Sequence, residues 1–514
     1  MKTIYQKLLA CLAVSSIGLA PMTAAVADPV RGGRATIATI GEPPALDPTI
    51  ATGDLLAAIT QHFMETLYTF DKDWKVVPLV ADKMPDISAD GKVYTIPLRR
   101  GVVFHNGQPM TSKDVLASLR RWMELASRGR QAAGMITSVD APDAFTIRIT
   151  LNTPYTPLLS LLAFNNSAAV IVPADTGKEP MASPIGTGPY KIKERKPDQY
   201  IHLVRHEAYN QRAGDPDGYG GARKQYLDEI VFVPVPDANT RIEGAMAGQY
   251  HYADLLPVES YQRLKTPASK SEAIIMESFA WPLFVFNTRQ GVMADRAIRL
   301  AAQAAMNSTD MMGAAFGNPD FFKVDGALYP KSYAWRSEAG VKAYNQADPE
   351  AAGKALKAAN YDGKPIRILT SRQYEFHYKM AQVAAEYMKV AGFKVDMQVV
   401  DWATLTQRRA DPALWDIFLT HYPFLAEPAL ILNLADTAPG WWVSPAKDKL
   451  LTAFNTETDA GKRAAIFSDI QALVYQEVPF YKIGDFNSLS AKAPAMKGYT
   501  PAPWPYFWNA WLEK

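Results

Sequence analysis

The sequence predicts an α/β protein with more than one folded unit. Segments that alternate apolar and polar residues, as strands do, occur along the whole chain between segments with the 3.6-residue spacing of amphipathic helices. In one place the two patterns join directly, because a helical apolar stripe over residues 376–387 leads through Gly392 into alternating residues 393–399. A helix that continues into a strand is typical of a wound α/β sheet. A length of 514 residues fits about two to four domains.

Other elements follow from local patterns. Alternation predicts strands over residues 94–98, 145–151 and 231–235, and the prolines of the third place it at a sheet edge or at a strand end. Residues 111–114 read Thr-Ser-Lys-Asp, which resembles a capping box, and the apolar residues after them share one helical face. These residues therefore predict the start of an amphipathic helix.

The last residues of the chain, 498–514, are unusually aromatic. This segment is too short to form a domain and too apolar to remain in water. We expect it to pack on an earlier part of the chain, which would make one domain discontinuous. Gly- and Pro-rich breaks at residues 175–183 and 213–224 predict loops.

Composition and motifs exclude several functional classes. The chain has 54 Lys and Arg against 52 Asp and Glu, so no net field favours nucleic acid or an anionic membrane. A single cysteine, Cys11, excludes a disulfide framework and a cysteine-based zinc site. Signatures of α/β-hydrolases, P-loops and dinucleotide sites are absent, and the seven histidines lack metal-binding spacing. We expect no catalytic residues, no metal, no cofactor and no nucleic-acid partner.

The first 27 residues resemble a secretory signal peptide. Lys2 and Lys7 precede a short apolar stretch, and Ala25 and Ala27 place small residues before Asp28. The apolar stretch is well below the ~20 residues that span a bilayer, so a membrane anchor is the weaker interpretation. We expect cleavage after Ala27 and a soluble protein in the periplasm that is not inserted in a membrane.

Four segments carry a family resemblance. The first segment, residues 98–120, contains an arginine-rich strand, a Phe-His-Asn-Gly-Gln-Pro-Met-Thr turn and an Asp-Val helix. The second is Gly-Thr-Gly-Pro-Tyr at residues 186–190, and the third contains Asn-Thr and Asp-Arg-Ala-Ile-Arg within residues 287–299. The fourth consists of the opening segments 43–48 and 65–68. Together and in this order they resemble the extracytoplasmic solute-binding proteins of family 5, which serve dipeptide, oligopeptide and nickel ABC importers.

The resemblance implies a particular architecture. The expected fold is the two-lobe periplasmic binding protein type II fold with an enlarged, discontinuous first lobe. Its parts would be a first lobe over residues 28–280 with an extra subdomain at roughly 75–190, a second lobe over 281–483, and a return of residues 484–514 to the first lobe. Hinge crossings are expected near residues 281–287 and 478–485, and closure around a ligand follows from the fold.

The resemblance also implies a function. We expect a monomeric receptor that captures a small-molecule ligand in the periplasm and delivers it to an ABC permease pair with cytoplasmic ATPases. A sensory or chaperone-like binding protein without a dedicated transporter is an alternative that the sequence leaves open. An exported hydrolase is disfavoured, because no nucleophile–base or metal constellation is visible.

Candidate ligand-binding residues come from the same resemblance. Arg372 and Tyr374 occupy the place of a ligand-binding Arg-x-Tyr in dipeptide receptors, and Trp402 matches their site tryptophan. The guanidinium suits a carboxylate and the indole suits stacking. The alternatives are a surface ion pair for Arg372 and core packing for Trp402. Thr52 and Gly53 are weaker candidates from the first lobe.

The expected ligand class follows from one position at which this sequence differs from the family pattern. Peptide receptors of this family place an aspartate four residues before the proline of a D-x-x-[DE]-P segment, where it pairs with an α-ammonium. Here that position is Phe424, ahead of Pro428. Because a buried ammonium needs a counter-charge, we expect a carboxylate-bearing solute, such as an amino-acid conjugate or opine, rather than an ordinary dipeptide. Glu427 could replace the aspartate, and Tyr422 could offer a cation–π contact.

Overall fold

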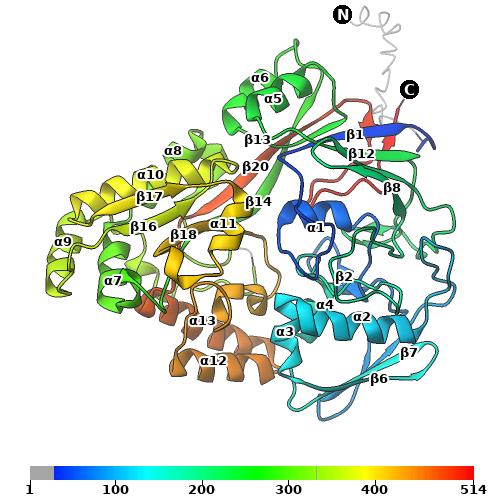
Figure 1. The fold of residues 1–514 in the computed structure, drawn as a ribbon, viewed down its shortest axis with the longest axis horizontal. Helices are drawn as coiled ribbons and strands as arrows, with labels where there is room; N and C mark the ends of the chain where they lie inside the picture. Colours follow the sequence, from blue (N-terminus) through cyan, green and yellow to red (C-terminus); the bar gives the residue numbers. More distant parts are fainter. Residues whose placement is uncertain (1–27, 332, 514) are drawn as a thin grey trace, which may run out of the picture.

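The computed structural model describes residues 28–331 and 333–513, so the expected signal peptide lies outside the described residues. Two α/β bodies lie on either side of two long strands, β14 (Glu272–Phe286) and β20 (Asp485–Lys492) (Figure 1). We call residues 28–271 and 493–513 the first lobe and residues 287–484 the second lobe. The predicted α/β class is confirmed, whereas the predicted boundaries at 280/281 and 483/484, which fall in or beside these strands, stay predictions.

One twelve-stranded sheet connects the lobes through β14 and β20. Its order is β17-β16-β18-β14-β20-β13-β1-β12-β9-β8, with β15 paired to β20 and β19 to β14. The first lobe contributes β1 (Arg34–Thr39), β8 (Tyr190–Lys196), β9 (Tyr200–Arg205), β12 (Glu229–Pro234) and β13 (Tyr252–Leu256). The second lobe contributes β15 (Phe322–Lys323), β16 (Ile366–Thr370), β17 (Val395–Val399), β18 (Ile417–Pro423) and β19 (Phe480–Lys482).

The strand predicted over residues 231–235 corrects one expectation. β12 pairs with β1 on one side and with β9 on the other, so it is not an edge strand. Pro234 is instead its last residue, where a missing N–H interrupts no further ladder bond. Of the two readings that the prolines allowed, the strand end is the one observed.

Helices cover the sheet. The first lobe holds α1 (Asp54–Thr60), α2 (Ser112–Leu125), α3 (Ser127–Ala133), α4 (Leu158–Ala163), α5 (Ala238–Met246) and α6 (Tyr261–Leu264). The second holds α7 (Arg296–Ala305), α8 (Ser308–Phe316), α9 (Pro349–Ala358), α10 (Glu375–Val390), α11 (Trp402–Arg408), α12 (Pro445–Thr456) and α13 (Ala460–Glu477). The predicted capping box is present, since the Thr111 N–H donates to Asp114 Oδ2 over 2.8 Å. In the α10 stripe, Met380 and Ala384 are buried and the other members are half-buried, and the helix ends before Gly392, whose φ is 97°.

A smaller four-stranded sheet lies in the first lobe. Its order is β4 (Asp86–Ile87), β5 (Val93–Pro97), β7 (Thr146–Leu151) and β6 (Ile136–Asp143). Helix α2 packs on it through Val115, Leu119 and Trp122, and all three are buried. This unit lies within the range expected for an extra subdomain. The short strands are β2 (Tyr68–Phe70), β3 (Val76–Pro78), β10 (Pro216–Asp217), β11 (Gly220–Gly221), β21 (Met496–Lys497) and β22 (Trp511–Leu512).

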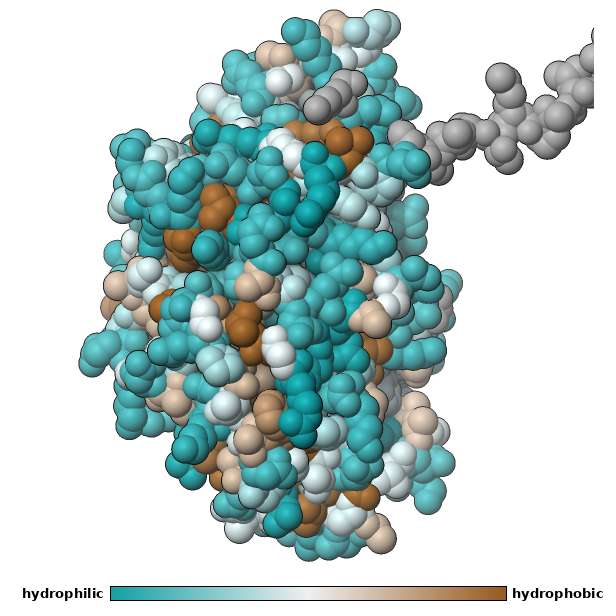
Figure 2. All heavy atoms as spheres, turned by 90° about the vertical axis from the view of Figure 1, so that its right-hand side faces the viewer, coloured by the Kyte–Doolittle hydropathy of each residue, from teal (hydrophilic) through white to brown (hydrophobic). Residues whose placement is uncertain are grey.

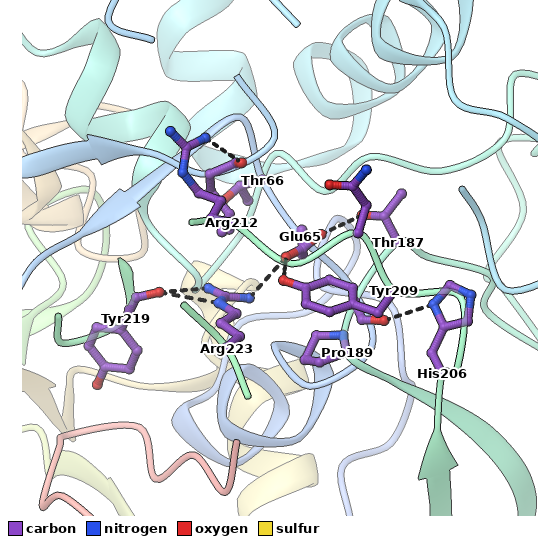
Figure 3. A network of polar contacts seen from close by, with 12 residues as sticks. Glu65, Thr66, Thr187, Pro189, His206, Tyr209, Arg212, Tyr219 and Arg223 are labelled. Atoms are coloured by element: carbon purple, nitrogen blue, oxygen red, sulfur yellow. Dashed lines mark hydrogen bonds and ion pairs between the residues drawn. The ribbon is translucent and has the colours of Figure 1, made fainter. Parts of the chain in front are cut away.

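The Gly-Thr-Gly motif allows close packing within the first lobe. A Cβ at Gly186 would lie 2.0 Å from the Phe63 carbonyl oxygen, so only glycine fits there. Between the glycines, the Thr187 hydroxyl donates to Glu65 Oε2 over 2.9 Å (Figure 3). The Tyr209 hydroxyl donates to Glu65 Oε1 over 2.8 Å, and Arg223 completes the buried network 3.5 Å away. This network ties the motif to the residues that follow α1.

The aromatic tail packs on the first lobe, as its composition predicted. Trp504 is 1% exposed and contacts the rings of Phe164 and Tyr219. The Phe507 N–H donates to His62 Nε2 over 3.0 Å. The C-terminal segment therefore completes the core of a lobe that begins more than 400 residues earlier.

The outer surface agrees with this arrangement of buried aromatic residues. The face in Figure 2, on the first-lobe side, is mostly hydrophilic, and its hydrophobic spots are small and separate. Across residues 28–331 and 333–513, every helix is too short or too polar to cross a membrane.

Candidate functional site

A cavity of about 520 Å³ lies between the lobes. The first lobe lines it with the loop before α1, the start of α1, and α3, and the second lobe lines it with residues from α11, β18 and the segment 432–441. Helices α1 and α11 face each other across the lobe boundary (Figure 1). Its volume is in the range of small-molecule sites.

Five of the seven predicted site residues line this cavity: Thr52, Gly53, Tyr374, Trp402 and Tyr422. Trp402 is the first residue of α11, where the Asp401 carboxylate accepts the Thr404 N–H over 2.9 Å and fixes the helix start. Tyr374 precedes α10, and its ring meets that of Trp402 edge-on at 4.8 Å. The two aromatic residues from different helices thus form one wall.

Arg372 and Phe424 lie elsewhere. Arg372 lines a separate groove of about 600 Å³ between α5, α6 and α10, and its guanidinium lies 4.3 Å from the centre of the Tyr378 ring. Phe424 packs between the rings of Trp74 and Tyr333, each at 4.9 Å. Arg372 therefore lies apart from Trp402, whereas Tyr374 lines both this groove and the interlobe cavity.

Glu427, the expected substitute for the missing aspartate, is also outside the cavity lining. Its Oε1 accepts from Arg463 Nη2 over 2.6 Å, and both side chains are largely buried. Burial raises the pKa of Glu427, and the Arg463 charge opposes that rise. Glu427 is thus paired with an arginine and does not line the cavity.

Three arginines line the cavity and were not predicted, and two of them, Arg128 and Arg409, make contacts across the lobe boundary. Arg128 of α3 is 2% exposed and donates to the carbonyl oxygens of Leu430, over 2.8 Å, and Asn166, over 3.1 Å. Arg409, at the end of α11, donates to the Thr52 hydroxyl over 3.1 Å. Neither guanidinium forms an ion pair with a carboxylate of the described chain. Burial lowers the pKa of Arg128 to about 10 and lowers the pKa of Arg409 as well.

Both arginines act on the same hydroxyl. Burial raises the pKa of Tyr422 to about 12, and the charges of Arg128 and Arg409 oppose this rise. The Tyr422 hydroxyl donates to Asn433 Oδ1 over 2.6 Å, which orients it. One corner of the cavity therefore combines cations from opposite lobes.

A chain of polar groups forms the other charged part of the cavity. Asp54 Oδ2 lies 3.3 Å from His421 Nε2, and His421 Nδ1 lies 3.1 Å from His377 Nε2. The Trp504 indole N–H, from the aromatic tail, donates to Asp54 Oδ1 over 2.9 Å. Among the described residues Asp54 is the one carboxylate that lines the cavity.

Local sequence gave few clues to these residues. Asp54 directly follows the predicted Thr52 and Gly53, and Arg409 lies two turns after Trp402, so a search for charged neighbours would have found both. Arg128 lies on a short helix with no recognisable pattern. Only the tertiary fold brings it to the cavity.

The histidines do not form a metal centre. His421 directs its two ring nitrogens to different partners, one to Asp54 and one to His377, so the three groups do not converge on a point. Over the described ranges, the structure contains no group of three His, Cys, Asp or Glu side chains that could hold a metal ion. The arrangement can bind an organic ion through guanidinium and carboxylate groups.

Comparison with known proteins identifies similar chains. The family profile described as bacterial extracellular solute-binding proteins, family 5 middle, matches residues 75–426. A probable peptide ABC transporter periplasmic-binding protein of Sinorhizobium fredii is 26% identical over 488 residues, which is 90% of each chain. A glutathione-binding protein of Pectobacterium atrosepticum is 26% identical over 516 residues, covering 94% of this chain and 95% of its own.

Solved structures resemble the fold. The periplasmic binding protein DppA of Helicobacter pylori, in complex with a peptide, has a TM-score of 0.83 at 23% identity and covers 94% of this chain and 99% of its own. A binding protein of Agrobacterium tumefaciens in complex with agropinic acid gives the same values. These likenesses confirm the predicted two-lobe fold.

Proposed function

The chain belongs to the family 5 bacterial extracellular solute-binding proteins, and we propose from this premise that its interlobe cavity holds a carboxylate-bearing solute. Membership confirms the predicted family and the predicted role as a solute-binding receptor of an ABC importer. To this we add a location in the periplasm after cleavage behind Ala27, action as a monomer, and delivery to a permease pair with cytoplasmic ATPases.

The observation that carries the proposal is the pair of arginines without counter-ions. Arg128 and Arg409 line the cavity from opposite lobes, donate to neutral oxygens, and form no ion pair with a carboxylate of the described chain. A buried cation without a partner is costly, so the cavity favours an anion that neutralises both. A carboxylate has two oxygens that can accept from guanidinium N–H groups on each side.

Such a ligand would also favour lobe closure. Contacts that cross the lobe boundary already include Arg409 to Thr52 and Arg128 to the Leu430 carbonyl. A carboxylate between the arginines would touch both lobes only when they are closed, and would therefore shift the population toward the closed state. The importer can then distinguish loaded from empty receptor.

Aromatic side chains define the rest of the ligand. Tyr374, Trp402, Trp441 and Phe164 line the cavity around the arginines. Such walls suit an apolar, aromatic or sugar-like portion next to the carboxylate. The names of the relatives, which mention peptides, glutathione and agropinic acid, support a solute of this chemistry.

Calorimetry with matched acids and esters tests the proposal. The probes are glutathione, alanyl-glutamate and octopine, each as the free acid and as the methyl ester. We expect the acids to bind and the esters to bind much more weakly. Arg409→Gln and Arg128→Gln should each cost about 2 kcal/mol or more in binding free energy. Esters that bind as well as the acids would overturn the carboxylate site.

Arg372→Gln is the matched control, because it removes the same charge outside the cavity. We expect unchanged affinity for this variant. A loss of affinity in Arg372→Gln together with none in Arg409→Gln would instead place the carboxylate in the groove beside α10.

A further inference from the structure

We propose that Asp54 binds a cationic nitrogen of the solute, so that the receptor selects zwitterions whose amine is free. The inference rests on the proposed function, because it adds a second charged contact to the carboxylate site. It assigns a specificity-determining role to a residue of the first lobe.

Asp54 is placed to meet a ligand. It lies in the first turn of α1, lines the interlobe cavity, and its side chain is 16% exposed. Its two neighbours, His421 and Trp504, contact different oxygens of the carboxylate, and each uses one ring nitrogen. Since an ionised carboxylate can accept about four hydrogen bonds, acceptor capacity remains for the cavity.

The protonation of the histidine pair follows from hydrogen-bond accounting. His377 is fully buried and its Nδ1 has no hydrogen-bond partner in the described chain. A proton on that atom would be an unsatisfied buried donor, so the proton belongs on Nε2 and is donated to His421 Nδ1. His421 must then accept at Nδ1, and its own proton lies on Nε2 and is donated to Asp54.

Both histidines are therefore neutral in this arrangement. Burial and the neighbouring His421 hold the pKa of His377 well below its usual range, in agreement with this assignment. Asp54 thus receives hydrogen bonds from two neutral groups and no full positive charge. Asp54 forms no ion pair with a lysine or arginine of the described chain, although the Arg128 charge lies near enough to interact with it, so its carboxylate can still accept a cation from the ligand.

Tyr374 adds a second polar group to this part of the cavity. The Tyr374 hydroxyl makes no hydrogen bond in the described part of the chain, and the Asp54 charge raises the pKa of Tyr374 in addition to burial. The Tyr374 ring also contacts the ring of His421, which lies against Asp54. An ammonium held by Asp54 can also donate to Tyr374, and the arginine corner remains free for the carboxylate.

This inference revises the expected ligand. Phe424, at the aspartate position of peptide receptors, predicted a solute without a free amine. The cavity nevertheless contains a carboxylate, which the first lobe contributes from α1. Selection against amines is therefore not expected, although the amine would not be held at the position of residue 424.

Calorimetry that compares amine-bearing ligands with their N-acetyl forms tests the role of Asp54. Glutathione and alanyl-glutamate are compared with their N-acetyl forms on the mature protein. We expect the free amines to bind at least tenfold more tightly, and Asp54→Asn to abolish this preference while both forms still bind. Glu386→Gln removes one negative charge from the exposed face of α10 and should keep the preference.

Each outcome separates this inference from the proposed function. N-acetyl forms that bind wild type as tightly as the amines, or amines that do not bind at all, overturn the role of Asp54. The carboxylate site would still stand if Arg409→Gln weakened the N-acetyl acids. The comparison of amine and N-acetyl form on wild type needs no variant, so misfolding of Asp54→Asn, detected by its melting curve, leaves the test intact.

Discussion

At the scale of single residues, the carboxyl group of Asp254 on β13 predicts how the stability of the folded protein depends on pH. Burial raises its pKa from 3.8 to about 6. In the unfolded chain the carboxyl ionises near pH 4, whereas in the folded protein it stays protonated up to about pH 6. Because the unfolded state loses its proton first, stability falls as the pH rises through this window and is constant above it.

Asp254→Asn should remove this penalty, because an amide still accepts from the Tyr252 and Ser490 hydroxyls. We expect the variant to be more stable than wild type by about 2 kcal/mol at pH 7 and equally stable at pH 4. Urea unfolding at both pH values measures the difference. A difference that does not change with pH would contradict the burial argument.

The residue scale is also where prediction from sequence reached its limit. Tyr374 and Trp402 were found because short motifs carried them, and the cavity indeed includes both. Arg128 and Arg409 line the same cavity only after folding, since 281 positions of chain separate them. Arg372 shows the converse, because a matching motif did not determine the direction of its side chain.

At the scale of elements, the aromatic tail is both packing and part of the site. Trp504 fills the space between Phe164 and Tyr219 and donates its indole N–H to Asp54. We expect Trp504→Ala to destabilise the protein by about 3–5 kcal/mol in urea unfolding.

Trp504→Phe separates the two roles, because it keeps much of the packing but removes the N–H donor. The expected loss of stability is smaller, and amine-bearing probes should bind with altered affinity while N-acetyl probes do not. If both variants unfold like wild type, the tail does not contribute to the core of the first lobe.

Elements were predictable where the pattern is local. The capping box of α2, the stripe of α10 and the alternation of β5 and β7 each appear in the structure close to the predicted residues. The sequence left open whether β12 was an edge strand or ended at its prolines, because strand neighbours come from distant segments, which periodicity does not report.

At the scale of the whole molecule, we propose that two lobes close on a carboxylate-bearing solute. Closure joins groups from both lobes, and neither Arg128 nor Arg409 forms an ion pair with a carboxylate of the described chain, so Asp54 is the one negative charge that the cavity lining sets against them. Two like charges brought together across a cleft oppose closure until an anion lies between them. Ligand retention should therefore depend on both arginines.

Native mass spectrometry of the protein purified without denaturation tests this claim most directly. We predict a mass increment in wild type from a bound small molecule that carries a carboxylate. The increment should be lost or strongly reduced in Arg128→Gln and Arg409→Gln, and retained in Arg372→Gln. A bound molecule without an acidic group, or one that both cavity arginine variants retain as fully as wild type, would contradict the account.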